Sequence, residues 1–375
     1  MPDSYNIPTG LRFPRPLLLA PGPHSLTPAV ARVMSGYRAE YTHRSTAYSD
    51  VYRQAVDLLR ELFYVPSGFT PLIFGHTGSY CWEMVARNTP ADGRVLGMDI
   101  GSFSARWALL FEDLGRRIAV QKAEWGLGIE PNAWVSAATE ANLVLVTHNE
   151  TSTGVAHPLP DMASSLSSVS PDTLLAVDGV SIAGAVNLNI TDLRPDYYFW
   201  SLQKDFSIPA IGSVMIVSDR AVETARSVSG RGYVLDIVEW VDRAASNQTP
   251  MTVPDLTLRC LAARLGEMLE EGPARFQRHL DITRLHRTWA ADRGLGILAK
   301  PGWESPTVTA IALPDGISGQ ALVKTAKKHL NVVLAPGYGK TKDSHFRIAA
   351  MGQTTMRTTE QVMEGIGMLL DEWNP

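Results

Sequence analysis

The feature that most constrains the fold is a series of short, continuous apolar segments separated by predicted helices. These segments span residues 71–74, 142–146, 174–177, 197–200 and 212–217. Apolar residues at successive positions, rather than at alternate positions, indicate strands buried on both faces, as in a mainly parallel sheet covered by helices. Each of the first four segments is followed by polar residues or glycine. Because ligands bind beyond the carboxyl ends of such strands, we expect the functional residues there.

The remaining pattern predicts two folded units. Apolar residues at helical spacing predict helices over 49–63, from about 81, and over 257–271. Beyond these, strands at 307–312, 331–334 and 346–348 and helices near 319–330 and 359–372 predict a smaller α+β unit. We therefore predict an α/β protein. Its parts are an N-terminal arm at 1–18, a large domain with the parallel sheet at 19–260, and a small α+β C-terminal domain at 261–375.

The composition excludes several classes of partner. The chain has 375 residues, 45% of them hydrophobic, which is enough for two domains. A net charge of −4 without a basic block predicts no nucleic-acid or membrane partner. No apolar stretch reaches the roughly 18 residues of a spanning helix, and the first residues lack the pattern of a secretory signal. Cys81 and Cys260 are isolated among apolar neighbours, so we expect reduced, buried thiols in a cytoplasmic protein and assign no metal ligands.

Two charged residues stand at the ends of apolar segments. Asp178 ends the segment at 174–177, and Lys204 follows 204 − 178 = 26 positions later, just after 197–200. Pyridoxal phosphate (PLP) chemistry needs this pair. A lysine amine forms a Schiff base with the aldehyde, and a carboxylate keeps the pyridine nitrogen protonated so that the ring accepts electrons. Alone, such an Asp is usually a helix cap and such a Lys a solvated charge. Together, flanked by Ser181 and Gln203, they predict Lys204 and Asp178 as catalytic residues.

Two turns could hold the rest of such a cofactor. Residues 75–80 join a strand to a helix, whose first N–H groups attract an anion such as phosphate. Thr77 and Ser79 supply hydroxyls there, and Gly78 lets the backbone approach. The alternative is a turn with Gly and Ser for geometry only. Phe103, just past Gly101, could stack on a pyridine ring, or it could be a core residue at a helix start.

Two further segments suggest ligand contacts. Residues 147–154 are rich in hydrogen-bonding groups directly after a buried strand, where burial is costly without partners. We prefer a ligand-facing role to that of a solvated cap. Arg347 has a planar guanidinium that can bind an α-carboxylate through two hydrogen bonds. A surface salt bridge explains Arg347 equally well at this point.

Taken together, these segments resemble the class V aminotransferases, a branch of the fold-type I PLP enzymes, from about residue 17 to the end. Residues 148–154 resemble the phosphoserine aminotransferase form of a cofactor-contacting loop, and 346–352 resemble the substrate-arginine segment of alanine–glyoxylate and serine–pyruvate aminotransferases. The other matching segments are Leu19-Ala20-Pro21-Gly22-Pro23, Thr42-His43-Arg44-Ser45 and Thr249-Pro250-Met251-Thr252.

The resemblance implies roles for the matching residues. Lys204 would carry the cofactor, Asp178 would pair with its ring nitrogen, and Phe103 would stack on its ring. The other implied cofactor-binding residues are Thr77, Gly78, Ser79, Thr151, Ser181, Gln203, Gln248 and Thr249. The last two would reach the phosphate of a neighbouring subunit, which implies a homodimer with shared active sites. The implied substrate-binding residues are Arg347, Gly22 and Arg44.

The expected activity is PLP-dependent transfer of an amino group between a small amino acid and a small 2-oxo acid, of the alanine/serine–glyoxylate or –pyruvate type. Phosphoserine aminotransferase is an alternative, and it would need a second cationic cluster. The candidates for that cluster are Arg44, Lys340, Lys342 and His345. The segment Asp205-Phe206-Ser207-Ile208-Pro209-Ala210 departs from the family's Gly-rich stretch with paired prolines. That departure keeps a PLP-dependent lyase or carbon–carbon bond-forming enzyme open. A non-catalytic dimer is disfavoured by Lys204 and Asp178.

Overall fold

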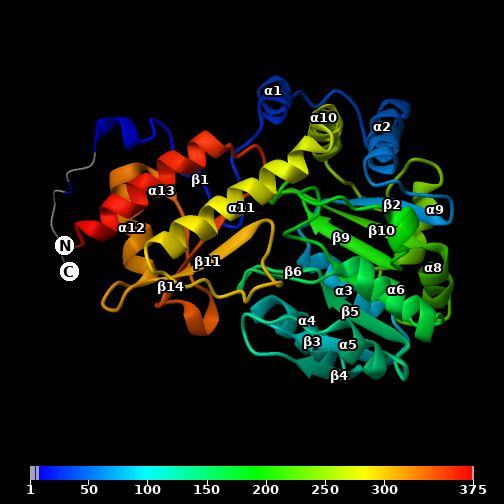
Figure 1. Cartoon of the computed structure of the whole chain (residues 1–375). Coiled ribbons are helices and arrows are strands. Elements are labelled where there is room, and N and C mark those ends of the chain that lie inside the picture. Colours follow the sequence, from blue (N-terminus) through cyan, green and yellow to red (C-terminus); the bar gives the residue numbers. More distant parts are fainter. Residues whose placement is uncertain (1–4, 6–7, 374–375) are drawn as a thin grey trace.

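The structure, a computed structural model, describes residues 5 and 8–373, so part of the predicted arm (1–4, 6 and 7) lies outside the described residues. Among the described residues, the largest element is a seven-stranded sheet in the order β2-β10-β9-β8-β5-β3-β4 (Figure 1). Its strands are β2 (Phe69–Phe74), β3 (Arg94–Asp99), β4 (Arg117–Lys122), β5 (Leu143–Thr147), β8 (Leu174–Asp178), β9 (Tyr197–Ser201) and β10 (Ser213–Ser218).

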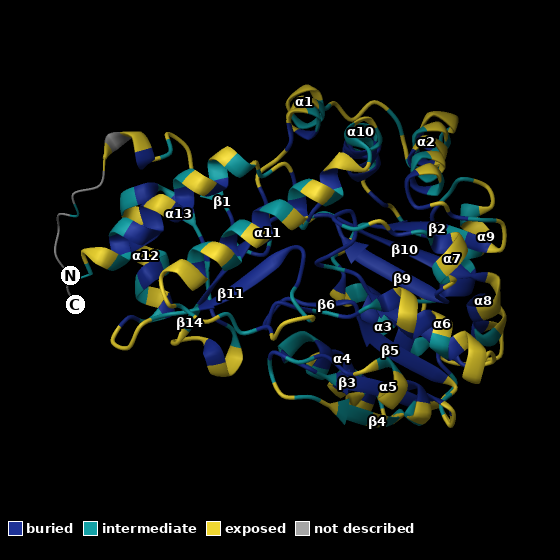
Figure 2. Cartoon of the chain, in the orientation of Figure 1, coloured by how far each residue is buried: buried dark blue, intermediate teal, exposed yellow. Residues whose placement is uncertain are grey.

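The prediction of a mainly parallel sheet is confirmed. The pairs β3–β4, β3–β5, β5–β8 and β8–β9 are parallel. Strand β10 runs antiparallel to both of its neighbours, β2 and β9. The segment from β9 to β10, residues 202–212, is therefore a short return and not a helical crossover. Figure 2 shows β5, β9 and β10 in the colour of buried residues, whereas the edge strand β4 is only partly buried.

Helices cover this sheet, and several begin at a side-chain cap. Ser45 accepts a hydrogen bond from the Tyr48 N–H, so the helix predicted from residue 49 begins earlier, at Thr46. The helices of this part are α1 (Pro28–Gly36), α2 (Thr46–Leu62), α3 (Ser79–Arg87), α4 (Ser102–Asp113), α5 (Pro131–Ala138), α6 (Leu159–Val169), α7 (Ile190–Leu193), α8 (Asp219–Arg226), α9 (Ile237–Ala244) and α10 (Asp255–Glu271).

A smaller α+β unit follows, reached through the long yellow helix α11 in Figure 1. Its three-stranded antiparallel sheet has the order β11-β14-β13. Its elements are α11 (Ala274–Asp292), β11 (Val308–Ala312), α12 (Gly319–Leu330), β12 (Val332–Val333), β13 (Ala335–Pro336), the 3₁₀ turn η2 (Gly339–Thr341), β14 (His345–Ala349) and α13 (Met356–Asp371). A short hairpin, β6 (Asn149–Glu150) with β7 (Val155–Ala156), leads from the large sheet toward this unit.

The N-terminal segment packs against the smaller unit. It contains the turn η1 (Thr9–Leu11) and the strand β1 (Leu17–Leu18), which pairs in parallel with β12. The Leu19 carbonyl accepts a hydrogen bond from the Ala349 N–H (2.8 Å). This segment therefore joins residues from opposite ends of the chain.

Two clusters of buried apolar side chains correspond to the two units. The larger one includes Leu265 and Met268 of α10, and the smaller one is built by α12, α13 and the strands beside them. Because α10 packs against the larger cluster up to Met268, we propose Gly272 as the domain boundary in place of 260/261. Cys81 and Cys260 are free and buried, as predicted. In the part of the chain that the structure describes, no helix is long and apolar enough to cross a membrane.

Candidate active site

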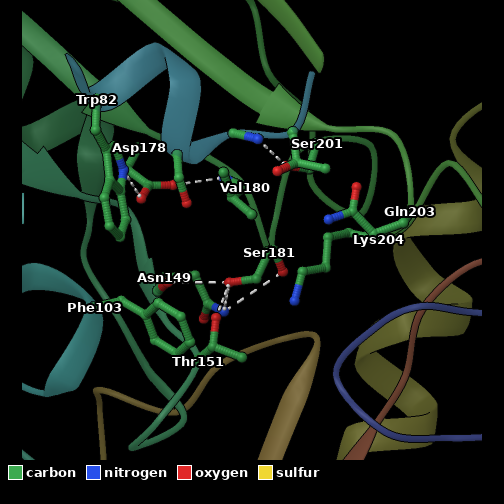
Figure 3. A pocket seen from close by; sticks show the side chains of 13 residues that line it. Trp82, Phe103, Asn149, Thr151, Asp178, Val180, Ser181, Ser201, Gln203 and Lys204 are labelled. Atoms are coloured by element: carbon green, nitrogen blue, oxygen red, sulfur yellow. Dashed lines mark hydrogen bonds between the residues drawn. The ribbon is translucent and has the colours of Figure 1, made fainter. Parts of the chain in front are cut away.

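The carboxyl ends of β2, β5, β8 and β9 surround a cavity of about 150 Å³ (Figure 3). Figure 3 shows Asp178 and Lys204 on opposite sides of this cavity. The residues that line it are Thr77, Gly78, Ser79, Trp82, Phe103, Asn149, Thr151, Asp178, Val180, Ser181, Ser201, Gln203 and Lys204. The sheet therefore brings together groups that lie far apart in the sequence, at the edge where the sequence predicts a ligand site.

A larger hollow of about 550 Å³ lies at the opposite end of the sheet, around Asp196 and Arg220. Both Asp196 carboxylate oxygens accept hydrogen bonds there, including two from Arg220. Volume alone therefore does not identify the site, since this hollow offers saturated polar groups and lacks a lysine amine.

The N-terminus of α3 forms one wall of the cavity. The Gly78 N–H donates to Ser201 Oγ (2.6 Å). A Cβ at Gly78 would lie 2.6 Å from Val180 Cγ2 and 2.7 Å from Ser201 Oγ, so only glycine fits this approach. Thr77 and Ser79 line the cavity on either side. The partial positive charge of this helix start and the two hydroxyls make a site suited to an anion such as phosphate.

The Asp178 carboxylate is buried and held by two donors. Trp82 Nε1 donates to Oδ2 (2.8 Å), and the Val180 N–H donates to Oδ1 (2.8 Å). Burial raises the pKa of Asp178 to about 6, although these hydrogen bonds act in the opposite direction. Trp82 was not predicted from the sequence. It lies one helical turn after Gly78, so helical spacing was the signal that placed it on the cavity side.

The Lys204 amine donates to the Pro21 carbonyl oxygen. Burial, and secondly the charge of Arg347, lowers the pKa of Lys204 to about 8. A larger fraction of the amine is therefore neutral and nucleophilic near neutral pH than for an ordinary lysine. The backbone at Gly22, with φ +82°, lies against this side chain, and a Cβ there would be 2.6 Å from Lys204 Cδ. Gly22 thus lets the N-terminal segment pass directly beside the amine.

Asn149, Thr151 and Ser181 form a hydrogen-bonded group on the cavity wall (Figure 3). Ser181 Oγ accepts from Asn149 Nδ2 (2.7 Å) and from Thr151 Oγ1 (2.9 Å). Within the described residues, the buried oxygens Asn149 Oδ1 and Gln203 Oε1 have no hydrogen-bond partner. Orphaned polar atoms that line a cavity indicate a bound ligand that would satisfy them.

Glu150 lies in the same loop but is not among the residues that line the cavity. Its buried carboxylate accepts hydrogen bonds from the Phe103 N–H (3.1 Å), the Ser104 N–H (2.8 Å) and the Ser152 N–H (3.0 Å). It therefore caps α4 and fixes the residue that bears the Phe103 ring. The sequence analysis missed this role, although an acidic side chain in a buried segment is itself a signal that it has partners.

Arg347 on β14 reaches across from the smaller unit. Nη1 donates to the Thr151 carbonyl (3.0 Å) and Nε to the Pro336 carbonyl (3.0 Å), while the guanidinium lies 5.2 Å from the centre of the Tyr338 ring. The side chain is buried, and burial lowers its pKa to about 10. None of the ion pairs in the described residues involves Arg347, so the surface salt bridge is the wrong interpretation. Arg347 does not itself line the cavity.

Three of the predicted site residues lie elsewhere on the same chain. Arg44 donates to the Thr249 carbonyl (2.7 Å) and the Pro250 carbonyl (3.0 Å). Gln248 Nε2 donates to Ser49 Oγ, and Thr249 Oγ1 donates to the Met251 carbonyl. Arg44 thus holds the 248–250 segment, and none of these residues lines the cavity of its own chain. Their predicted contact with a neighbouring subunit stays a prediction.

The family model described as aminotransferase class-V matches residues 23–260. The chain belongs to the class V aminotransferases. The resemblance seen in the sequence is thereby confirmed, and the protein is a transaminase. Serine–glyoxylate aminotransferase from Methylorubrum extorquens is 32% identical over 348 residues, which are 89% of this chain and 86% of that protein. L-aspartate–glyoxylate aminotransferase from Paracoccus denitrificans is 26% identical, with 94% and 92% covered.

Solved structures of aminotransferases share the fold. An aspartate aminotransferase of subgroup IV from Thermus thermophilus superimposes with a TM-score of 0.86 at 27% identity, covering 95% of this chain and 99% of that one. The predicted fold-type I architecture is thereby confirmed. Family membership implies PLP as the cofactor. The residues present fit this group, since the cavity offers a lysine amine, a buried carboxylate, an anion-binding helix start and unpartnered amide oxygens.

Proposed function

We propose that this class V aminotransferase uses PLP to move an amino group from a small amino acid to glyoxylate. The observation that carries the proposal is the placement of the Lys204 amine and the Asp178 carboxylate in one cavity beside the N-terminus of α3. The two relatives named above act, by their names, on glyoxylate with serine or aspartate as partner. When bound, PLP supplies an aldehyde that captures the amino group and a ring that accepts electrons.

The chain's own residues would divide this work. Lys204 holds the cofactor through its amine and, once displaced by the substrate amine, moves the proton from the substrate Cα. Asp178 holds the proton on the ring nitrogen, and its burial strengthens that interaction. Thr77, Gly78 and Ser79 bind the phosphate at the helix start.

The remaining cavity residues would orient the ring. Phe103, held in place by the capped start of α4, would stack on the ring. Thr151, which Ser181 positions through their hydrogen bond, would bond to the phenolic oxygen. Gln203 also lines the cavity, and its side-chain amide N–H₂ would donate to the phosphate.

Arg347 would bind the substrate carboxylate. Its Nε and Nη1 donors are engaged by carbonyl oxygens, which fix the plane of the guanidinium. Nη2 bonds to no residue that the structure describes, so part of the fork is available for a carboxylate. The backbone at Gly22, next to Lys204, would border the same substrate.

We further propose a cytoplasmic homodimer with shared active sites. Arg44 would present the Gln248 and Thr249 segment to the cofactor phosphate of the neighbouring subunit, consistent with their distance from the cavity of their own chain. The two free thiols fit a reducing compartment. Measuring the mass in solution tests the dimer, and a monomer with full activity would refute it.

A half-reaction experiment tests the proposed chemistry. The PLP-loaded protein is mixed with serine, alanine, aspartate or phosphoserine, and both the loss of the lysine-linked cofactor absorbance and the released 2-oxo acid are measured. We expect one equivalent of oxo acid per site from a small amino acid, and recovery of the absorbance on adding glyoxylate. Release of ammonia, or of a cleaved carbon fragment, would instead identify a lyase. If phosphoserine is the best donor, the result would favour a phosphoserine aminotransferase.

A further inference from the structure

Asp205, the residue after the catalytic lysine, is fully buried and contacts two distant segments. Its Oδ1 accepts a hydrogen bond from His279 Nε2 on α11 (2.7 Å) and one from the Gly352 N–H (2.8 Å). Its carbonyl accepts from Arg264 Nη2 on α10 (3.4 Å). One side chain thus joins the turn that bears Lys204 to α11 and to the segment that continues β14.

The contact between Asp205 and His279 is a buried hydrogen bond between a carboxylate and an imidazole. Burial alone would raise the pKa of Asp205, but His279, Arg264 and the Gly352 N–H together outweigh it and lower that pKa to about 2. The other ring nitrogen of His279, Nδ1, lies 2.6 Å from the Arg275 carbonyl, which can only accept. Both ring nitrogens of His279 thus face oxygen atoms, which fixes the orientation of the ring.

A buried pair of this kind costs desolvation and is better suited to fixing a geometry than to adding stability. Within the described residues, Asp205 Oδ2 also lacks a hydrogen-bond partner. A carboxylate that is buried at this desolvation cost, directly after Lys204, indicates a role in the active site.

The backbone around Gly352 lies tightly against the lysine turn. A Cβ at Gly352 would be 2.1 Å from Ser207 Oγ, and Gly352 has φ +61°. Ser207 itself adopts the left-handed region, with φ +53°, which is unfavourable for a residue other than glycine. From the other side, Arg278 Nη1 donates to the Gly352 carbonyl (2.9 Å). The position of Gly352 is therefore fixed by several contacts, and the hydrogen bond to the Asp205 carboxylate links it to the turn that bears Lys204.

We propose that Asp205 is a positioning residue that sets the separation between the Lys204 amine and the Arg347 guanidinium. Lys204 precedes Asp205 directly, and Arg347 lies five residues before Gly352 on β14. A substrate must meet the lysine-linked cofactor with its amine and Arg347 with its carboxylate at the same time. Small errors in that separation cost reactivity, because attack needs close and aligned atoms. This inference rests on the proposed role of Arg347 and deepens it.

The test compares Asp205→Ala and Asp205→Asn with Asp196→Asn. Asp196 is also a buried, paired carboxylate, but it lies at the opposite end of β9 and has no contact with β14. In the PLP-loaded proteins, titration of the lysine-linked absorbance gives the affinity for an amino acid and for its decarboxylated amine. The ratio of the two affinities depends on where Arg347 sits, and it is insensitive to the fraction of protein that is folded.

We expect the wild type to prefer the amino acid over the amine. Asp205→Ala should lower that preference roughly tenfold or more while the affinity for the amine changes little. Asp205→Asn should have a smaller effect, because its amide oxygen can still accept from the Gly352 N–H. Asp196→Asn should keep the wild-type ratio. If both Asp205 variants keep it too, Asp205 has no positioning role.

A second measurement needs no cofactor. Amide hydrogen exchange of a peptide covering 350–354 in the cofactor-free protein should be faster in Asp205→Ala than in the wild type or in Asp196→Asn. Equal exchange in all three proteins would show that Asp205 does not hold the segment around Gly352. If Asp205→Ala does not fold, the affinity ratio of Asp205→Asn decides, and a wild-type ratio in that variant would overturn the proposal. If the wild type does not distinguish acid from amine, Arg347 does not bind the carboxylate, and the proposed function fails before Asp205 is at issue.

Discussion

The two ends of strand β9 differ in how completely their polar groups are satisfied. At the amino end, each oxygen of Asp196 accepts two hydrogen bonds, from Leu175, Ser218 and Arg220. At the carboxyl end, Asp205 Oδ2 and Ser207 Oγ have no partner among the described residues, and Ser207 is left-handed. The same strand thus has a saturated end and a strained, incompletely satisfied end.

This difference distinguishes a structural group of residues from a functional site without reference to sequence similarity. Unpartnered polar atoms, strained backbone and shifted pKa values destabilise a fold, and they persist where a ligand uses them. The saturated end has the larger hollow, about 550 Å³ against about 150 Å³. The chemical state of the lining groups is therefore a better guide to the active site than its size.

The strongest test of this contrast between the two ends of β9 is the substitution Lys204→Ala. We expect at least about a 10³-fold loss of turnover with the fold retained, because one change removes both the attachment point and the proton-transfer base. Borohydride reduction of the wild type followed by peptide mapping should place the cofactor on Lys204. The matched control is Lys122→Ala at the exposed edge strand β4, which should keep full activity. A label on another lysine would contradict the assignment.

A direct contrast between the two ends comes from Asp178→Asn and Asp196→Asn. The first should lower turnover roughly 10²- to 10³-fold, since a neutral amide cannot hold the ring-nitrogen proton by charge. The second should lower the free energy of unfolding by about 1–3 kcal/mol and leave turnover per folded molecule unchanged. Turnover and urea unfolding of both variants check this. Near wild-type turnover in Asp178→Asn would show that Asp178 only caps the backbone that follows β8.

Arg347→Ala should weaken substrate binding by about 2–3 kcal/mol, or roughly 30- to 150-fold, because a charge-assisted pair is lost. Cofactor binding should change little. Arg347→Lys should rescue poorly, since an ammonium lacks the planar fork that the Thr151 and Pro336 carbonyls orient. Titration with an amino acid and with its decarboxylated amine gives the result. An equal loss for both compounds would show that Arg347 does not bind the carboxylate.

The smallest expected effect is on the pH dependence of cofactor binding. Burial raises the pKa of Asp178 to about 6 in the cofactor-free protein, so the carboxylate that pairs with the ring nitrogen is lost as pH falls through 6. Cofactor affinity should therefore fall about tenfold per pH unit below that value. The cofactor phosphate also titrates near pH 6. The measured quantity is thus the ratio of wild-type to Asp178→Asn affinity between pH 8 and 5, and a constant ratio would contradict the prediction.

The sequence predicted the sheet and the lysine–aspartate pair because both follow from local pattern. Continuous apolar strands imply two covered faces, and carboxyl ends of parallel strands converge, so Asp178 and Lys204 had to lie near one another. The antiparallel direction of β10 was not predictable, since a fully buried strand has the same pattern in either direction.

The sequence analysis also missed contacts that form only when distant segments pack together. Trp82 meets Asp178 only after α3 packs on the sheet, and Glu150 finds its donors at the start of another helix. The pairing of Asp205 with His279 spans 74 positions and depends on the arrangement of α11. Sequence shows that a buried charge needs a partner, and the fold determines which one.

The N-terminal segment also has a consequence for biosynthesis. Leu17 pairs with Val332, Leu19 with Ala349, and Pro21 receives the Lys204 amine. A ribosome makes this segment before the large sheet, and its strand partners emerge more than 300 residues later. Synthesis at roughly 5–20 residues per second leaves the segment unpaired for many seconds while the large sheet can already fold. The wall beside the lysine is therefore completed last, and a stalled or truncated chain would hold a folded core without a finished catalytic centre.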